Sequence, residues 1–199
     1  MRDPPMTTPT GRRERNKQDK LARITAAARE LFEEHGADEV TTQQIADRAD
    51  VAIGTLFFHA RTKAELLLLV QNSRYVEALE RGRAAAEAAA TPLDAVMALV
   101  GETVACNRKQ VDNGRTYLRE LVFGDPAEPH HRAALELAGQ AEVAVAEVLT
   151  RAGEDPDSAA VRASVVTAVL FLGMATAGPE DSTADVLTGI RTRLQLLVG

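Results

Sequence analysis

The chain has 199 residues, of which 45% are hydrophobic and 26% are charged, the proportions of a soluble globular protein. Its one cysteine, Cys106, excludes an intrachain disulfide framework. No run of about 18 consecutive apolar residues indicates a membrane span, and the first residues lack the apolar segment of a secretory signal. We therefore expect a cytoplasmic protein without membrane association, long enough to bury a sizeable core.

The net charge of −6 hides a local excess of positive charge near the N-terminus. Residues 11–29 carry seven lysines and arginines but only two acidic residues. A basic segment on an acidic protein is typical of an end that binds a polyanion, although a solvated charged tail has the same composition. Because residues 1–16 contain three prolines and little that is apolar, we expect them to form a flexible basic arm.

The rest of the sequence predicts an all-α protein, because apolar residues recur at steps of three and four. The first helix is expected over residues 17–35, where Gly36 would end it in the left-handed conformation. A short second helix would begin at Thr41 or Thr42, with Gln44 completing a capping box. A third short helix would begin near Thr55.

A long fourth helix is expected from residue 63 or 64. Its run of leucines over residues 66–69 covers every side of a helix, so we expect this segment to be buried nearly all round, between two domains. Five further helices are predicted between breaks at glycine or proline, over residues 92–111, 114–124, 130–152, 157–177 and 182–198.

Residues 41–63 combine two short helices joined by a tight turn. Ala46 and Ala49 are small enough to let the two helices cross closely. This is the pattern of a helix-turn-helix, whose second helix enters the DNA major groove. That second helix would present an unusual polar and aromatic surface made of Thr55, Phe57, Phe58, His59 and Lys63.

The same segment resembles the DNA-binding domain of the TetR family of transcriptional repressors, over about residues 17–70. The family pattern runs Thr-x-x-x-Ile-Ala-x-x-Ala-Gly-Val-Ser-x-Gly-Thr-Leu-Tyr-x-His-Phe-x-Ser-Lys-x-x-Leu, and Ala-x-x-Leu-Phe-x-x-x-Gly precedes it. The sequence matches at Ala28, Leu31, Phe32, Gly36, Thr42 or Thr41, Ile45, Ala46, Ala49, Val51, Gly54, Thr55, Leu56, His59, Lys63 and Leu66 or Leu67. The resemblance implies a DNA-binding domain over residues 17–63 and a helical effector-binding and dimerisation domain over residues 64–199.

The sequence departs from the family pattern at Asp50, Ala52, Phe57, Ala60 and Thr62. Phe57 stands where the family has a tyrosine whose hydroxyl contacts a phosphate, and the loss of one neutral hydrogen bond costs about 0.5–1.5 kcal/mol. Ala60 stands where the family has a phenylalanine packed under the recognition helix. We expect the missing hydroxyl to weaken DNA binding without abolishing it, and the leucines that follow to fill the space left at Ala60.

The resemblance also implies which residues contact double-stranded DNA. Lys63 and His59 would contact phosphates with release of counterions, and Gln43 would read a base edge in the major groove. The full expected set is Thr42, Gln43, Thr55, Phe57, Phe58, His59 and Lys63. Unless it is a solvated tail, the basic arm would follow the minor groove through Arg12, Arg13 and Arg15.

The C-terminal part is expected to bind a ligand and a second copy of the chain. Family members pair their last two helices with those of a partner, so we expect a homodimer here and a pseudo-palindromic operator, although an intramolecular core explains the same apolar faces. The middle helices would enclose a pocket for a hydrophobic effector, lined by Met97, Cys106, Tyr117, Leu121, Phe123 and Phe171. Three arginines would either hold an acidic group or be solvated, namely Arg108, Arg115 and Arg119.

The expected function is that of a ligand-responsive DNA-binding regulator, a repressor released from its operator by a small hydrophobic effector. The sequence has no nucleophile–base set, no cluster with metal-ligand spacing and no phosphate-binding glycine loop, so we expect no enzyme activity, metal or cofactor. The alternative is a helical protein that binds small molecules or acts as a scaffold and has lost specific DNA binding. Specific binding to a duplex separates the two.

Overall fold

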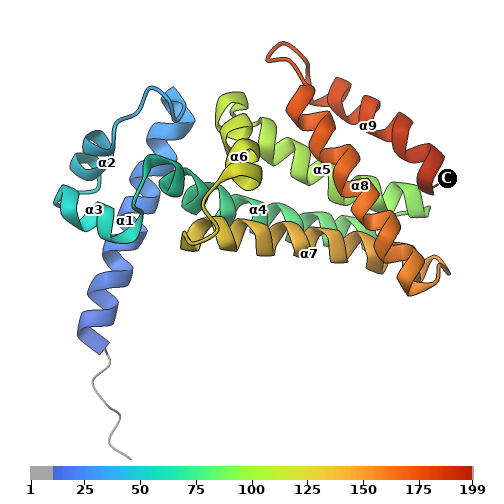
Figure 1. The fold of residues 1–199 in the computed structure, drawn as a ribbon, viewed down its shortest axis with the longest axis horizontal. Helices are drawn as coiled ribbons and strands as arrows, with labels where there is room; N and C mark the ends of the chain where they lie inside the picture. The colour runs from blue at the N-terminus through green and yellow to red at the C-terminus, as the bar shows by residue number, and fades with distance from the viewer. Residues whose placement is uncertain (1–10, 199) are drawn as a thin grey trace, which may run out of the picture.

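The computed structural model describes residues 11–198, and these residues fold into helices without any strand (Figure 1). The helices are α1 (Gly11–His35), α2 (Thr42–Arg48), α3 (Ile53–His59), α4 (Lys63–Glu87), α5 (Pro92–Arg108), α6 (Val111–Phe123), α7 (Pro129–Arg151), α8 (Pro156–Thr176) and α9 (Thr183–Val198). The all-α expectation is therefore confirmed.

The helices form an elongated molecule with the short helices at one end (Figure 1). The first three helices pack together there, and α1 projects past them. The helices α4 and α7 run side by side along the molecule, while α8 and α9 lie at the far end. The long helix α4 is thus the element shared by the two ends.

The helix starts follow from local capping chemistry. Thr41 caps α2 by accepting a hydrogen bond from the backbone N–H of Gln44, and the Gln44 side chain completes the predicted capping box. Thr62 caps α4 in the same way, through the backbone N–H of Glu65 at 3.1 Å. Such caps satisfy N–H groups that a helix start leaves without partners.

Three predicted boundaries are wrong, and one of them is the end of α5, which lies at Arg108 and not at residue 111. The helix α1 begins at Gly11, so residues 11–16 are helical and not part of an arm, because this charged run consists largely of good helix formers. Residues 1–10 and the side chains of Arg12 and Arg13 lie outside the described residues. The helix α6 begins at Val111 and not at residue 114, because the Gln110 side chain accepts a hydrogen bond from the Asn113 backbone and caps the helix earlier.

The leucine run at the start of α4 joins two hydrophobic clusters. Leu66 and Leu67 pack with the core of α1, α2 and α3. Leu68, one residue further, packs with Tyr75 and Tyr117 in a cluster that belongs to the C-terminal helices. Leu69 is half-buried. The segment is therefore shared by the two ends of the molecule, and three of its four leucines are buried.

The helix α8 differs from the other helices in its exposed apolar surface. In the described part of the chain, it is the one helix that is long and apolar enough to cross a membrane, by length and composition alone. Only 22% of that stretch is buried. The sequence analysis had excluded such a span. Its exposed apolar residues include Val161, Val165 and Leu172.

Candidate nucleic-acid interface and ligand cavity

The helices α2 and α3 pack through three fully buried side chains. Ile45 and Ala46 on α2 and Leu56 on α3 are each 0% exposed. Because Leu56 points inward, its neighbours on the other side of this short helix face solvent. Phe57 is 43% exposed and Phe58 is 72% exposed, which is unusual for large aromatic side chains without a partner.

The predicted DNA-contacting residues fall on both short helices and on the start of α4. Gln43 is exposed, and its amide donates to the Asp47 carboxylate at 2.7 Å. The ammonium of Lys63 donates to the backbone carbonyl of Asp38 at 3.1 Å, which holds the start of α4 against the loop before α2. Thr42 is half-buried in the first turn of α2.

A groove between α1 and α3 brings together residues that the sequence analysis treated apart. Thr55, Phe58 and His59 come from α3 and form one wall. The other wall comes from α1 and consists of Glu14, Asn16, Lys17 and Lys20. The sequence analysis counted the two lysines in the basic run but did not assign them to the site. Their spacing of three residues places both on one face of a helix, which was the available signal.

Lys17 and His59 determine the electrostatics of this groove. The Lys17 ammonium lies 5.9 Å from the centre of the Phe58 ring, within the range of a cation–π contact. The pKa of His59 is lowered from 6.5, first by partial burial and then by the positive charges of Lys17, His130 and Lys20. The groove is thus electropositive before any anion arrives.

A cavity of about 90 Å³ lies among the C-terminal helices. The described lining side chains carry no charge, and the main ones are Tyr75, Leu79, Leu99, Thr103, Tyr117, Leu121, Leu137, Ala141, Leu170, Phe171 and Met174. Tyr75 and Tyr117 stack with their ring centres 4.6 Å apart. Burial raises the pKa of both phenols, so both stay protonated at neutral pH.

Three of the six residues predicted for the pocket line this cavity, namely Tyr117, Leu121 and Phe171. The other three lie elsewhere. Phe123 ends α6 with 81% of its surface exposed, Met97 packs into the core beside the cavity, and Cys106 packs outside the tyrosine stack. Apolar character alone could not separate a cavity wall from the core or the surface. Burial raises the Cys106 pKa to about 11, so it is a neutral thiol.

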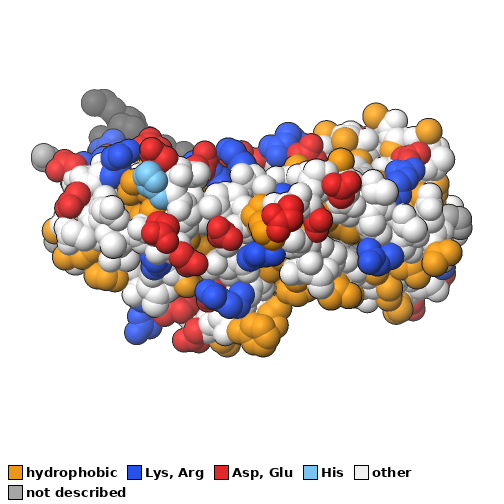
Figure 2. All heavy atoms as spheres, turned by 90° about the horizontal axis from the view of Figure 1, so that it is seen from above, with side chains coloured by type: hydrophobic (Ala, Val, Ile, Leu, Met, Phe, Trp, Pro, Cys, Tyr) orange, Lys and Arg blue, Asp and Glu red, His pale blue; other side chains and the backbone are white. Residues whose placement is uncertain are grey.

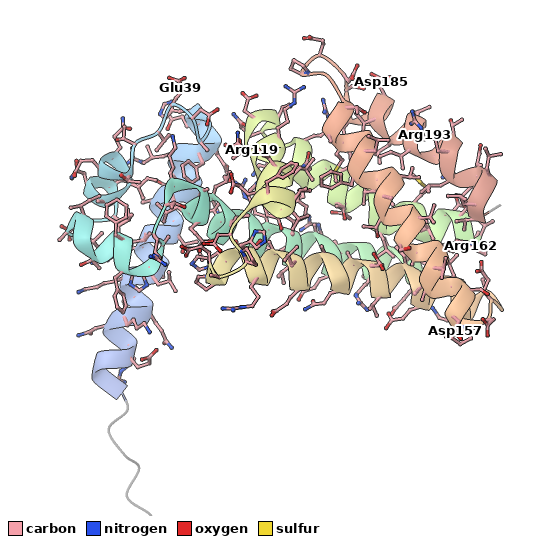
Figure 3. The ribbon with its side chains drawn as sticks, in the orientation of Figure 1. Glu39, Arg119, Asp157, Arg162, Asp185 and Arg193 are labelled. Atoms are coloured by element: carbon pink, nitrogen blue, oxygen red, sulfur yellow. The ribbon has the colours of Figure 1, made fainter. Side chains whose placement is uncertain are left out.

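The three arginines considered for an acidic ligand do not line the cavity. Arg108 donates to the Gly178 carbonyl at 3.1 Å and Arg115 to the Ala177 carbonyl at 2.8 Å, so both hold the loop after α8. Arg119 lies at the surface of α6, beside Glu120 (Figure 3).

Asn113 ties the C-terminal helices to α1. Its side chain donates to the Phe32 carbonyl and accepts from the Ala37 backbone N–H, each at 2.7 Å. It is 1% exposed, so both bonds form away from water. Sequence reasoning placed Asn113 in a break between helices and had no signal for this contact, since its partners are 76 and 81 positions away.

The family model described as "Bacterial regulatory proteins, tetR family" matches residues 24–70, which span the C-terminal half of α1, all of α2 and α3, and the start of α4. This segment of the chain is similar to the DNA-binding domain of the TetR family. The match covers most of the segment predicted from the resemblance, residues 17–70, and it includes the wall of the groove formed by α3 but not the wall formed by α1. No curated protein sequence matches the chain.

Solved TetR-family structures share the whole fold. A Thermus thermophilus FadR, a TetR-family transcriptional repressor in complex with lauroyl-CoA, is 25% identical, with a TM-score of 0.70 over 88% of this chain and 93% of that chain. A Rhodococcus TetR transcriptional regulator is 21% identical, with a TM-score of 0.68 over 92% and 97%. A Bacillus subtilis FadR in complex with stearoyl-CoA is 18% identical, with a TM-score of 0.66 over 89% and 97%. These relatives are named as regulators, not enzymes.

At two of the positions that depart from the TetR-family pattern, Ala60 and Asp50, the structure shows how the different residue is accommodated. Ala60 is 2% exposed and packs with the leucines of α4, so no large side chain is needed there. Asp50, in the turn between α2 and α3, has a positive φ of 50°. Asp tolerates that conformation better than most residues with a side chain, but glycine adopts it without strain.

Proposed function

We propose that this chain is a DNA-binding transcriptional regulator that represses from a pseudo-palindromic operator as a homodimer and is released by a small hydrophobic effector. The observation that carries the proposal is the groove between α1 and α3. It combines two lysines, a histidine and an exposed aromatic ring on a helix-turn-helix. A groove of this composition suits a phosphate backbone on one side and a major groove on the other.

Each contact has a distinct part in this proposal. Lys17, Lys20 and Lys63 would neutralise phosphates, and His59 would donate a hydrogen bond to one. Gln43 would read a base edge after releasing Asp47, its partner in the free protein. Phe57 and Phe58 would pack against sugars or thymine methyl groups. The phosphate contacts of Lys17 and Lys20, which line the groove from α1, would offset the hydroxyl that Phe57 lacks.

The homodimer is supported by the exposed face of α8. Along it, apolar and small residues follow steps of four and three, at Val161, Val165, Ala168, Leu172 and Ala175, and each of them is exposed. Hydrophobic side chains gather along one edge of the C-terminal half of the molecule (Figure 2). A two-fold pairing of this face would bury it. It would also set the two recognition helices at half-sites one or more DNA turns apart, each turn about 34–36 Å.

The hydrophobic effector is supported by the uncharged cavity. A charged group within it would lose its hydration without gaining a partner, so the buried part of the ligand is apolar. The acyl-CoA complexes of the two FadR relatives make a long acyl chain our first candidate.

The alternative is a small-molecule-binding protein without DNA affinity, motivated by the missing hydroxyl at Phe57. A titration of the purified protein into mixed-sequence duplex DNA at several salt concentrations separates the two. The proposal predicts binding whose affinity falls steeply with salt, because counterions are released. The alternative predicts no binding even at low salt, while the acyl compound still binds.

A further inference from the structure

We propose that Asn72 is a positioning residue that couples occupancy of the cavity to the recognition helix α3, through the first turn of α7. This inference rests on the proposed function, and it names a hydrogen-bonded route between the two sites. The route runs from the cavity wall at Tyr117, through Asn72 on α4 and His130 on α7, to His59 at the end of α3.

The first link attaches α7 to the DNA-binding end. A ring nitrogen of His130, Nε2, lies 3.0 Å from the backbone carbonyl of His59, the last residue of α3. The carboxylate of Glu65, which is 3% exposed, accepts from the backbone N–H groups of His130 at 3.2 Å and His131 at 3.1 Å. These N–H groups lack partners within their own helix, so Glu65 fixes the position of the α7 start.

The second link is Asn72 itself, whose side-chain amide bonds both to the start of α7 and to Tyr117 at the cavity wall. Its Nδ2 donates to the His130 carbonyl at 2.9 Å, and its Oδ1 accepts from the Tyr117 hydroxyl at 3.0 Å. The orientation of the amide follows from chemistry, because the His130 carbonyl can only accept a hydrogen bond. Asn72 therefore cannot keep both bonds if Tyr117 and the α7 start move apart.

The third link is the cavity wall. Tyr117 is 4% exposed, stacks on Tyr75 and lines the cavity. The cavity of about 90 Å³ is smaller than the ~150 Å³ engineered cavity that takes up benzene. A ligand whose buried part is larger than the cavity must displace the walls, because a protein interior is close-packed. Displacement of Tyr117 pulls on Asn72 and then on the turn that holds His59.

The two stacked tyrosines provide a matched pair of variants. Tyr117→Phe removes the hydroxyl that donates to Asn72 and leaves the ring in place. Tyr75→Phe removes a hydroxyl that accepts from Asn107 at 2.9 Å, which is outside the route. Each variant is combined with Ala138→Trp, which places a large ring at the cavity wall and acts as a ligand held in cis.

Two readouts are measured for every variant: affinity for a duplex enriched by selection, and hydrogen exchange of the amides in α3 and the first turn of α7. We expect Ala138→Trp to weaken duplex binding about tenfold or more, within the ~5–150-fold range of allosteric couplings, and to speed exchange at both places. In the Tyr117→Phe protein, Ala138→Trp is expected to weaken duplex binding only a few-fold. In the Tyr75→Phe protein, Ala138→Trp is expected to weaken duplex binding and speed exchange as much as it does in the wild-type protein.

The outcomes separate this inference from the proposed function. The route would be overturned if adding the tryptophan changed hydrogen exchange equally in the wild-type, Tyr117→Phe and Tyr75→Phe proteins, or changed it in none of them. In a protein that binds the duplex, equal losses of duplex affinity in all three would overturn it as well. The protein could also bind no duplex and still show hydrogen exchange that responds to the tryptophan only when the Tyr117 hydroxyl is present. That result would support the route and reject the proposed function. If Ala138→Trp does not fold, Ala141→Trp fills the same cavity and is used with the same criteria.

Discussion

The ammonium of Lys17 on α1 lies 5.9 Å from the centre of the Phe58 ring on α3. This contact places a lysine from the first helix beside the predicted recognition helix, 41 positions further along the chain. Lys20 lines the same groove. The groove in the candidate interface is therefore built by two helices.

We expect Lys17→Ala and Lys20→Ala each to weaken duplex binding by a similar factor on every sequence. Each should lower the slope of log affinity against log salt by about one, because one phosphate contact is lost. Fluorescence anisotropy at several salt concentrations measures the slope. Arg151→Ala, at the far end of α7, is the matched control. A slope that stays the same in both lysine variants would remove α1 from the interface.

DNA binding is expected to strengthen as the pH falls through and below about 6.5. The free protein holds the pKa of His59 below its ordinary value, and a phosphate would raise it by stabilising the imidazolium. Binding then takes up as much as one proton, which changes the affinity by up to about tenfold per pH unit. His59→Gln should flatten this dependence, whereas His35→Gln, at the exposed end of α1, should retain it. A pH profile unchanged by His59→Gln contradicts the contact.

The same pKa shift predicts an effect on folding. Because the pKa of His59 is lowered in the folded protein, the unfolded chain binds more protons once the pH is below about 6.5. The free energy of unfolding should therefore decrease as the pH falls through that range, and less so in His59→Gln.

Asp50→Gly is expected to stabilise the protein. The positive φ of Asp50 costs an L-residue about 1–2 kcal/mol, which glycine avoids while losing more chain entropy. The Arg23–Asp50 ion pair at 3.1 Å is lost, but Asp50's side chain is 96% exposed, so the pair contributes little. Chemical denaturation should show a gain of up to about 1 kcal/mol. A clear loss of stability would mean that the ion pair outweighs the strain.

The double substitution Val161→Glu and Leu172→Glu is expected to dissociate the homodimer without unfolding the chain, since both side chains are exposed, at 67% and 61%. Charges on facing surfaces would repel and lose hydration. Sedimentation equilibrium measures the mass, and circular dichroism checks the fold. Val143→Glu, at a 54% exposed valine on α7, is the control. A wild-type protein that is monomeric at micromolar concentration would contradict the proposal.

Periodic spacing was sufficient to predict the number, order and most boundaries of the helices, because apolar stripes, caps and breaks are local signals. The start of α1 was missed since a charged helix without an apolar stripe has the composition of a tail. The interface was predicted on α2, α3 and α4 and on the arginines before residue 16, but Lys17 and Lys20 were missed, because Lys17 and Phe58 meet only after folding. The contacts of Asn72, Glu65 and Asn113 were out of reach for the same reason: each joins residues distant in the chain.

The most direct test of the central claim is selection of duplexes from a random pool by the purified protein, at two salt concentrations. We expect enrichment of an inverted repeat whose half-sites are one or more helical turns apart, with weaker retention at the higher salt. The α1–α3 groove accounts for the salt dependence and the α8 face for the two-fold symmetry. A pool that remains random at both salt concentrations would contradict the assignment of this surface to sequence-specific DNA binding.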